Sequence, residues 1–323
     1  MEKIKHILEV AQFSRDWLEK DLFPRTKEME GYIDARLARY WAVVPRLMFS
    51  LFYEPSTRTR FSFESAFIKL GGSVVSTENA EEFSSAVKGE TIEDTMRTLN
   101  GYKPDCIVMR SKVVGDAVKA AAKSVAPVIN AGDGSGEHPT QALLDVYTIS
   151  KCFGWAPIDG LQIAMVGDLD KGRTVRSLSK ILANWKRIKI YYVSPENARM
   201  RQDVKDFLVE RGVEWEEFSD LRDVAGRVNV IYQTRTQKER GTNFERGQAF
   251  SITKQTLQFM KPDAIILHPL PRNEEIAIEV DDDPRAKYFE QAENGLYVRM
   301  ALLVSIVSAY DNERYERQKQ YCP

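Results

Sequence analysis

The fold is decided by residues 46–70, which read RLMFSLFYEPSTRTRFSFESAFIKL. Residues 46–53 form a nearly continuous apolar run, the pattern of a buried strand. The apolar side chains that follow recur at i, i+3, i+4 and i+7, which is one face of a helix: Phe63, Ala66, Phe67 and Leu70. Gly71 and Gly72 then predict where this helix ends. A strand that leads directly into a helix is the repeating unit of parallel α/β sheets.

The same unit recurs along the rest of the chain. Further strands are expected at residues 105–109, 126–130, 161–166, 188–193, 228–233 and 263–267. Helices are expected at residues 91–99, 139–152, around 175–185, and from about 297 onward. This alternation predicts an α/β fold in which each sheet is parallel and flanked by helices.

The chain length of 323 residues predicts two domains of ordinary size. We place the division inside the helix 139–152, because that helix lies between two groups of strands. The last helix follows the final strand of the second group, and we expect it to return to the first domain. The expected domains are therefore residues 1–145 with 297–323, and residues 146–296.

Composition places the chain among soluble enzymes. Hydrophobic residues make up 43% and charged residues 29%, and the net charge of −1 argues against broad binding to nucleic acid or acidic membranes. The N-terminus lacks the apolar core of a signal peptide, and no apolar run approaches the roughly 20 residues of a membrane span. Cys106, Cys152 and Cys322 have no metal-binding spacing, and we interpret them as reduced thiols of a cytoplasmic protein.

Polar segments follow six of the expected strands. In the first half these segments are EPSTRTR, Arg110 and AGDGSGEHPTQ, and in the second half they are GDLDKGRT, TRTQKER and HPLPR. Ligands of parallel α/β sheets bind outside the carboxyl ends of the strands. The pattern therefore predicts one functional site built from both domains.

The segment Ser56-Thr57-Arg58-Thr59-Arg60 lies where a strand turns into a helix. The first turn of a helix offers unpaired N–H groups and the positive end of the dipole, so this segment favours phosphate binding. A serine cap followed by a solvated basic face is the structural alternative. Two arginines near a helix start oppose the dipole, which favours the binding interpretation.

Five further residues of the first half are candidates for binding. Arg110 stands at the end of a buried strand, where a ligand contact competes with an internal ion pair. His138 and Gln141 follow a loop whose three glycines permit close backbone approach to a ligand. Ser84 and Lys88 lie in a loop that leads into a helix, and taken alone Lys88 is an exposed loop lysine.

The second half offers arginines for an anionic substrate. GDLDKGRT nearly matches the nucleotide phosphate loop, but Arg173 replaces the lysine that such a loop requires. A planar guanidinium at this position suits a carboxylate instead. Arg235 and Gln237 alternate after a strand and face the same side, so with Arg173 they can bind a dicarboxylate. A solvated charged segment is the alternative for residues 238–240.

Taken together, the motifs resemble the aspartate carbamoyltransferase family. The resemblance rests on segments that occur in order between about residues 46 and 310: STRTR, SxxxKGET, GDGSGEHPTQALLD, GDLxxGRTV, TRxQKER and HPLPR. It implies transfer of a carbamoyl group from carbamoyl phosphate to L-aspartate, an early step of de novo pyrimidine biosynthesis. It also implies a carbamoyl-phosphate-binding first domain, an aspartate-binding second domain, a homotrimer with shared active sites, and neither a metal nor an organic cofactor.

The resemblance also implies a role for each matching residue. Carbamoyl phosphate is expected to contact Ser56, Thr57, Arg58, Thr59, Arg110, His138, Gln141, Pro269 and Leu270. Among these, the carbonyl group is polarised by Thr59, Arg110 and His138, and its amino group is held by Gln141 and the backbone of Pro269 and Leu270. Aspartate is expected to contact Arg173, Arg235 and Gln237. Ser84 and Lys88 are expected to come from the neighbouring subunit.

Departures from the family pattern and rival functions remain at this point. Lys171 and Arg176 replace an aromatic residue and a histidine of some relatives, beside Arg173. Residues 111–124 lack the pattern with which regulated relatives contact a regulatory chain, but a regulatory chain or a dihydroorotase partner is not excluded. Ornithine carbamoyltransferases carry a cysteine where this chain has Pro269. A catalytically silent homologue would have lost a motif residue, and none is lost here.

Overall fold

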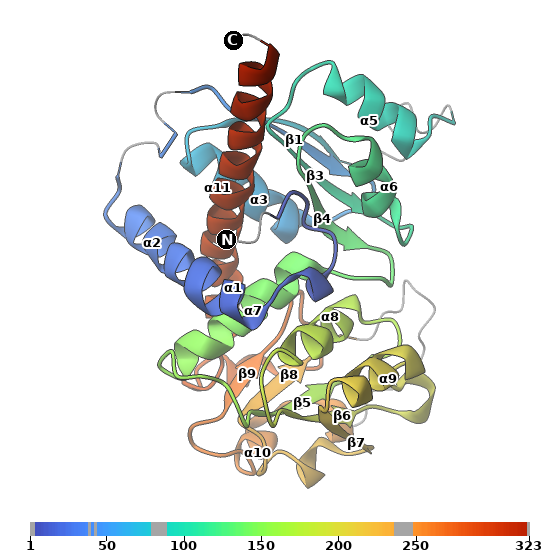
Figure 1. The fold of residues 1–323 in the computed structure, drawn as a ribbon. Coiled ribbons are helices and arrows are strands. Elements are labelled where there is room, and N and C mark those ends of the chain that lie inside the picture. The colour runs from blue at the N-terminus through green and yellow to red at the C-terminus, as the bar shows by residue number, and fades with distance from the viewer. Residues whose placement is uncertain (1–3, 38–39, 42–43, 79–88, 236–247, 322–323) are drawn as a thin grey trace. The chain divides into compact units, whose positions relative to one another are not determined.

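The computed structural model describes residues 4–37, 40–41, 44–78, 89–235 and 248–321. Its contacts divide the chain into two compact units, residues 1–140 with 295–323 and residues 141–294. The chain enters the second unit within α7 (Pro139–Cys152) and returns within α11 (Tyr288–Tyr321) (Figure 1). No helix in those described ranges is long and apolar enough to cross a membrane.

The first unit is built on a parallel sheet of four strands in the order β2-β1-β3-β4. The strands are β1 (Leu47–Phe52), β2 (Ser73–Glu78), β3 (Cys106–Ser111) and β4 (Val128–Asp133). The helices between them are α3 (Thr57–Lys69), α5 (Ile92–Asn100) and α6 (Asp116–Lys123). Before the sheet come η1 (Val10–Gln12), α1 (Arg15–Trp17), the π-helical η2 (Leu18–Leu22) and α2 (Phe23–Asp34).

The second unit is built on a parallel sheet of five strands in the order β7-β6-β5-β8-β9. The strands are β5 (Gln162–Val166), β6 (Lys189–Val193), β7 (Glu214–Phe218), β8 (Val230–Gln233) and β9 (Ile265–Leu267). The helices are α8 (Arg173–Leu182), α9 (Gln202–Glu210) and α10 (Lys254–Leu257), with single 3₁₀ turns at η4 (Glu196–Ala198), η5 (Leu221–Asp223), η7 (Gln248–Phe250) and η8 (Ile278–Val280). The predicted class, two helix-flanked parallel sheets, is confirmed.

Each unit has its own hydrophobic core between sheet and helices. In the first unit, buried side chains of β1, β3 and β4 pack with Tyr310, which α11 contributes after it has returned. In the second unit, side chains of β5, β6, β8 and β9 pack with Tyr288 at the start of the same helix. The predicted return of the C-terminal helix is therefore confirmed, although the helix begins well before residue 297. The finer domain bounds 145/146 and 296/297 stay a prediction.

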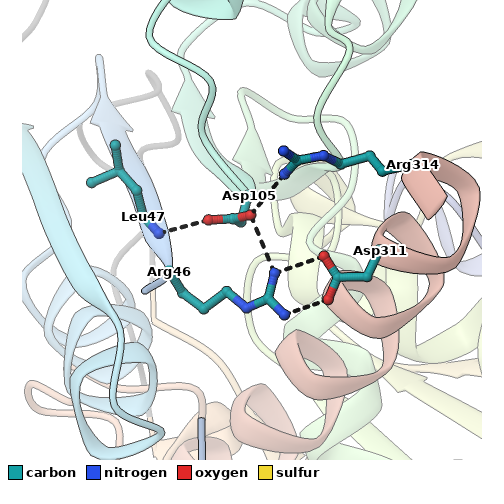
Figure 2. Close-up of polar contacts among 5 residues, drawn as sticks. All are labelled: Arg46, Leu47, Asp105, Asp311 and Arg314. Atoms are coloured by element: carbon teal, nitrogen blue, oxygen red, sulfur yellow. Dashed lines mark hydrogen bonds and ion pairs between the residues drawn. The ribbon is translucent and has the colours of Figure 1, made fainter. Parts of the chain in front are cut away.

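A partly buried ion network fixes α11 to the first sheet. The guanidinium of Arg46 binds both carboxylate oxygens of Asp311 on α11 and lies 3.4 Å from a carboxylate oxygen of Asp105 (Figure 2). The other oxygen of Asp105 accepts the N–H of Leu47 at 2.8 Å, and Arg314 approaches Asp105 at 3.4 Å. The side chains of Arg46 and Asp105 are only 11% and 8% exposed, so each charge depends on its partners.

Replacing Arg46 by methionine should destabilise the first unit, because buried Asp105 and partly exposed Asp311 then lose their shared cation. We expect the free energy of unfolding to fall by about 3 kcal/mol, the order found when one partner of a buried pair is removed. Denaturant titration of the Arg46→Met variant measures this. The matched control is Lys20→Met, because the Lys20–Asp16 pair is exposed and should leave the midpoint unchanged. Equal midpoints for both variants would show that the network does not stabilise the fold.

Candidate active site

The first half of the candidate site begins where β1 turns into α3. Ser56 is the N-cap of α3, and its side chain makes no capping hydrogen bond. The first N–H groups of a helix have no partner inside the helix, so this end of α3 presents donors and a positive partial charge. Thr57 and Arg58 are exposed in the first turn and Thr59 is buried. The predicted phosphate-type segment therefore starts a helix, as expected.

Arg110 lies on the neighbouring strand at the same edge of the sheet. It pairs in register with Phe52, the last residue of β1. Its Nη1 donates to the carbonyl oxygen of Ala131 at 3.2 Å, and its Nε lies 3.3 Å from a carboxylate oxygen of Glu54. The side chain is almost fully buried. Both interpretations of Arg110 thus have support, because an internal ion pair holds a guanidinium at the predicted ligand edge.

The loop between β4 and α7 places His138 at the start of α7. Two N–H groups, those of Glu137 at 2.8 Å and Gly115 at 2.9 Å, donate to the carboxylate of buried Asp133. Gly134 has φ +49°, and a Cβ there would come within 2.4 Å of a backbone oxygen. The loop is therefore held by its own hydrogen bonds, and His138 at its end is 3% exposed.

The second half of the candidate site is built in the same way from β5 and α8. Gly167 follows β5 with φ +114°, and a Cβ there would approach the oxygens of Thr234 at 2.6 and 2.7 Å. The fully buried carboxylate of Asp168 accepts the N–H of Lys171 at 3.1 Å. Buried Arg173 is the first residue of α8. A carboxylate enclosed in this loop repels phosphate groups, which argues against a nucleotide phosphate loop.

Arg235 and the HPLPR segment follow the two neighbouring strands. Val166 pairs with Gln233, and Tyr232 pairs with Leu267, so β5, β8 and β9 end side by side. Arg235 follows β8 directly after Thr234, and His268 follows β9. This arrangement brings the predicted carboxylate-binding arginines to adjacent strand ends in one unit.

The HPLPR loop is fixed by hydrogen bonds of its histidine. His268 is buried, its Nδ1 accepts the N–H of Leu270 at 2.7 Å, and its Nε2 lies 2.9 Å from Glu275. His268 is therefore engaged inside the loop. The expected ligand contact through the backbone of Pro269 and Leu270 stays a prediction.

Sequence reasoning did not find Asp145, Tyr232 and Gln291, which lie beside Gln141. The carboxylate of Asp145 accepts the Gln141 side-chain amide at 2.8 Å, the Gln291 amide at 2.6 Å and the Tyr232 hydroxyl at 2.9 Å. In the sequence each of the three resembles an ordinary helix or strand residue. The one available signal is that Asp145 is the last residue of the motif GDGSGEHPTQALLD.

Some predicted residues lie outside the described residues, namely Ser84, Lys88 and Gln237. Arg176 binds both carboxylate oxygens of Asp203 on α9. Within the part of the chain that the structure describes, no group of three or more histidine, cysteine, aspartate or glutamate side chains is arranged to hold a metal ion.

Comparison with known proteins decides the family. Residues 5–151 match the carbamoyl-phosphate-binding domain of aspartate/ornithine carbamoyltransferases, and residues 159–306 match their Asp/Orn-binding domain. The chain belongs to the aspartate/ornithine carbamoyltransferase family. A chloroplastic aspartate carbamoyltransferase of Arabidopsis thaliana is 54% identical over 93% of this chain and 77% of its own length. The aspartate carbamoyltransferase catalytic subunit of Pyrobaculum islandicum is 44% identical over 94% and 98%.

Solved carbamoyltransferase structures also match the whole fold. An aspartate transcarbamoylase of Trypanosoma cruzi, in complex with carbamoyl phosphate and aspartate, superposes with a TM-score of 0.82 at 38% identity. The match covers 94% of this chain and 96% of that one. The same enzyme bound to N-(phosphonacetyl)-L-aspartic acid gives a TM-score of 0.84 at 39% identity, over 94% and 95%.

The comparison corrects one expectation. The N-terminus and the cysteines predict a cytoplasmic location, and this prediction is wrong, because the names of similar plant proteins point to the plastid. The relatives from Arabidopsis thaliana, Oryza sativa and Pisum sativum are all named chloroplastic.

Proposed function

We propose that this chain is an aspartate carbamoyltransferase, whose named residues carry out the transfer as follows. The reaction moves the carbamoyl group of carbamoyl phosphate to the amino group of L-aspartate and gives N-carbamoyl-L-aspartate and phosphate, an early step of de novo pyrimidine biosynthesis. The observation that carries the proposal is that one chain holds both a phosphate-type helix start, in its first unit, and two arginines at adjacent strand ends, in its second. Relatives with this name at about half identity support it.

The phosphate group is bound at the start of α3. Ser56, Thr57, Arg58 and Thr59 offer hydroxyl and backbone donors together with a guanidinium, and Arg110 adds a second guanidinium at the neighbouring strand end. Fixed donors cost little reorganisation when an anion arrives, because the loops that hold them are already hydrogen-bonded.

The carbonyl oxygen of the carbamoyl group is polarised by Thr59, Arg110 and His138. The neutral amine of aspartate attacks the carbamoyl carbon, and negative charge builds on that oxygen in the tetrahedral intermediate. The C–O bond to phosphate then breaks, and phosphate leaves with the bonding electrons. Donors preorganised toward the developing charge lower the barrier, and buried His138 and Arg110 act in a poorly hydrated setting where this effect is large. We propose that the departing phosphate accepts the amine proton.

The remaining contacts orient the two substrates. The amino group of the carbamoyl moiety donates to Gln141 and to the backbone carbonyls of Pro269 and Leu270. Arg173, Arg235 and Gln237 bind the two carboxylates of aspartate, since guanidinium groups match carboxylates in a planar, two-bond geometry. Holding both substrates in register removes much of the entropic barrier.

Aspartate should be carbamoylated and ornithine should not. Ornithine carries a side-chain ammonium where aspartate carries a carboxylate, and the second unit presents Arg173 and Arg235 to that group. We expect carbamoylated product with L-aspartate and essentially none with L-ornithine. Chromatography of the reaction mixture measures the product. The control is Arg173→Ala, which should raise the KM for aspartate and leave ornithine inert. Comparable turnover of ornithine by the unaltered protein would overturn the proposal.

His138→Ala should lower kcat more than it weakens binding of carbamoyl phosphate. The hydrogen bond to the carbonyl oxygen strengthens as charge develops, so its loss falls mainly on the transition state. We expect kcat to fall about 10²–10³-fold, as for other donors of this kind. His6→Gln is the matched control, since His6 lies in the same unit and accepts a hydrogen bond from the N–H of Val128, which begins β4 at the end away from the loop that leads to His138. An unchanged kcat in His138→Ala would remove this residue from the mechanism.

We also propose that the functional particle is a homotrimer whose active sites are shared, with Ser84 and Lys88 coming from a neighbouring subunit. Two exposed apolar features support a subunit contact next to that segment. Phe61 and Ile68 lie seven residues apart on one face of α3, and each is more than half exposed. Val75 is exposed on β2. β2 is an edge strand of the first sheet, and exposed edges of this kind are usually covered.

Mixed trimers test the shared site. Lys88→Ala and Arg110→Ala chains should each be nearly inactive as pure trimers. After mixing and reassembly at equal amounts, about one shared site in four should combine an intact Lys88 with an intact Arg110, as random assembly of a closed ring requires. Activity well above both parents, in a particle of trimeric mass, is the expected result. An active Lys88→Ala trimer, or no recovery after mixing, would show that each chain supplies its own site.

A further inference from the structure

A single buried carboxylate lies at the centre of the hydrogen bonds around Gln141. Asp145 is fully buried, and its Oδ1 accepts the side-chain amides of Gln141 on the preceding turn of α7 and of Gln291 on α11. Its Oδ2 accepts the hydroxyl of Tyr232. An ionised carboxylate only accepts hydrogen bonds, so all three partners must turn a donor toward it.

This restriction determines which way the Gln141 amide points. A glutamine side chain ends in one oxygen, which accepts, and one NH₂ group, which donates. Because the NH₂ group of Gln141 is bound to Asp145 at 2.8 Å, its oxygen occupies the other end of the amide. The amino group of a carbamoyl moiety is a donor and requires an acceptor. The oxygen of Gln141 is the end that satisfies this requirement.

The same carboxylate also fixes the loop that supplies the backbone acceptors. Gln291 turns its NH₂ group to Asp145 at 2.6 Å, so its oxygen accepts the N–H of His268 at 2.8 Å. His268 in turn accepts the N–H of Leu270 through Nδ1, which sets the path of the chain through Pro269. One chain of hydrogen bonds therefore joins Asp145 to the backbone at residues 268–270.

Tyr232 supplies the third donor to the Asp145 carboxylate. Burial and the neighbouring Asp145 carboxylate raise the pKa of the Tyr232 phenol well above its ordinary range. The hydroxyl therefore stays protonated and donates to Oδ2 over the range in which the protein is handled.

We propose that Asp145 is a positioning residue that selects the amino group of the carbamoyl moiety, by orienting the Gln141 oxygen and the 268–270 backbone together. The proposal rests on the proposed function, which assigns these acceptors to carbamoyl phosphate. It predicts that Asp145 governs the preference for carbamoyl phosphate over acyl phosphates that lack the amino group. Asp145 makes no contribution to binding the phosphate group itself.

Acetyl phosphate and inorganic phosphate separate these contributions. Acetyl phosphate replaces the amino group by a methyl group, and inorganic phosphate lacks the acyl part altogether. The experiment measures the KM for carbamoyl phosphate and the inhibition constants of both probes in the full-length protein. In Asp145→Ala the KM for carbamoyl phosphate should rise about tenfold, the cost of losing one or two oriented hydrogen bonds. Both inhibition constants should stay within about twofold, since neither probe uses the reoriented acceptors.

Asp145→Asn provides the conservative rescue. The asparagine oxygen can still accept both glutamine amides, and the Tyr232 hydroxyl can turn to accept from the new NH₂ group. This variant should keep the preference for carbamoyl phosphate to within about threefold. Asp283→Ala is the control for general loss of stability, because it removes a carboxylate of the same unit that pairs with Arg285. It should leave the preference unchanged.

The possible outcomes are distinguishable. If the unaltered protein does not prefer carbamoyl phosphate to acetyl phosphate, the assignment of these acceptors in the proposed function fails. If the unaltered protein prefers carbamoyl phosphate and the Asp145→Ala variant retains the full preference, only the positioning role of Asp145 is overturned. Equal weakening of all three ligands by Asp145→Ala would show a merely structural role and would also overturn it. Should Asp145→Ala not fold, Gln291→Met breaks the chain one link further on and is expected to lower the preference in the same direction.

Discussion

The parallel direction of the strands is the constraint on which the rest of the structure depends. In a parallel sheet every strand ends at the same edge, so the residues that follow different strands become neighbours although they are distant in sequence. In the first unit this edge collects the start of α3, Arg110 and the loop that ends at His138. In the second unit it collects the start of α8, Arg235 and the loop 268–270. Two sheets of one kind thus give two half-sites of one kind.

Buried aspartates hold the loops at these edges. Asp133 accepts two backbone N–H groups of its surroundings, Asp168 accepts one within the loop before α8, and Asp145 accepts three side-chain donors. Each carboxylate is almost completely withdrawn from water, so each must be compensated by donors. That requirement fixes the loops before any substrate arrives. A preorganised arrangement of donors is what stabilisation of a developing oxyanion requires.

Much of this organisation could be predicted from the sequence, for reasons visible in particular residues. Central strands such as β1 and β5 are buried on both faces and therefore appear as apolar runs. In contrast, β2 (SVVSTE) and β7 (EWEEF) lie at sheet edges, are partly exposed and are mostly polar. These two partly exposed edge strands therefore do not stand out in the sequence, whereas the edge strands β4 and β9 are buried and do. The role of Asp145 was hidden as well, because its partners Tyr232 and Gln291 are distant in sequence and carry no local motif. The positions of Ser56, Arg110, His138 and Arg173 at strand ends followed from the pattern alone.

The central claim is that one ligand uses the phosphate half and the carboxylate half at the same time. N-(phosphonacetyl)-L-aspartate carries both groups in one molecule and is bound by the related Trypanosoma cruzi enzyme. The most direct test is a calorimetric titration of the protein with this compound and with phosphonoacetate, which lacks the aspartate part. The account predicts that the linked compound binds at least about a hundredfold more tightly, since joining two bound groups saves association entropy. Equal affinity for the two compounds would contradict it.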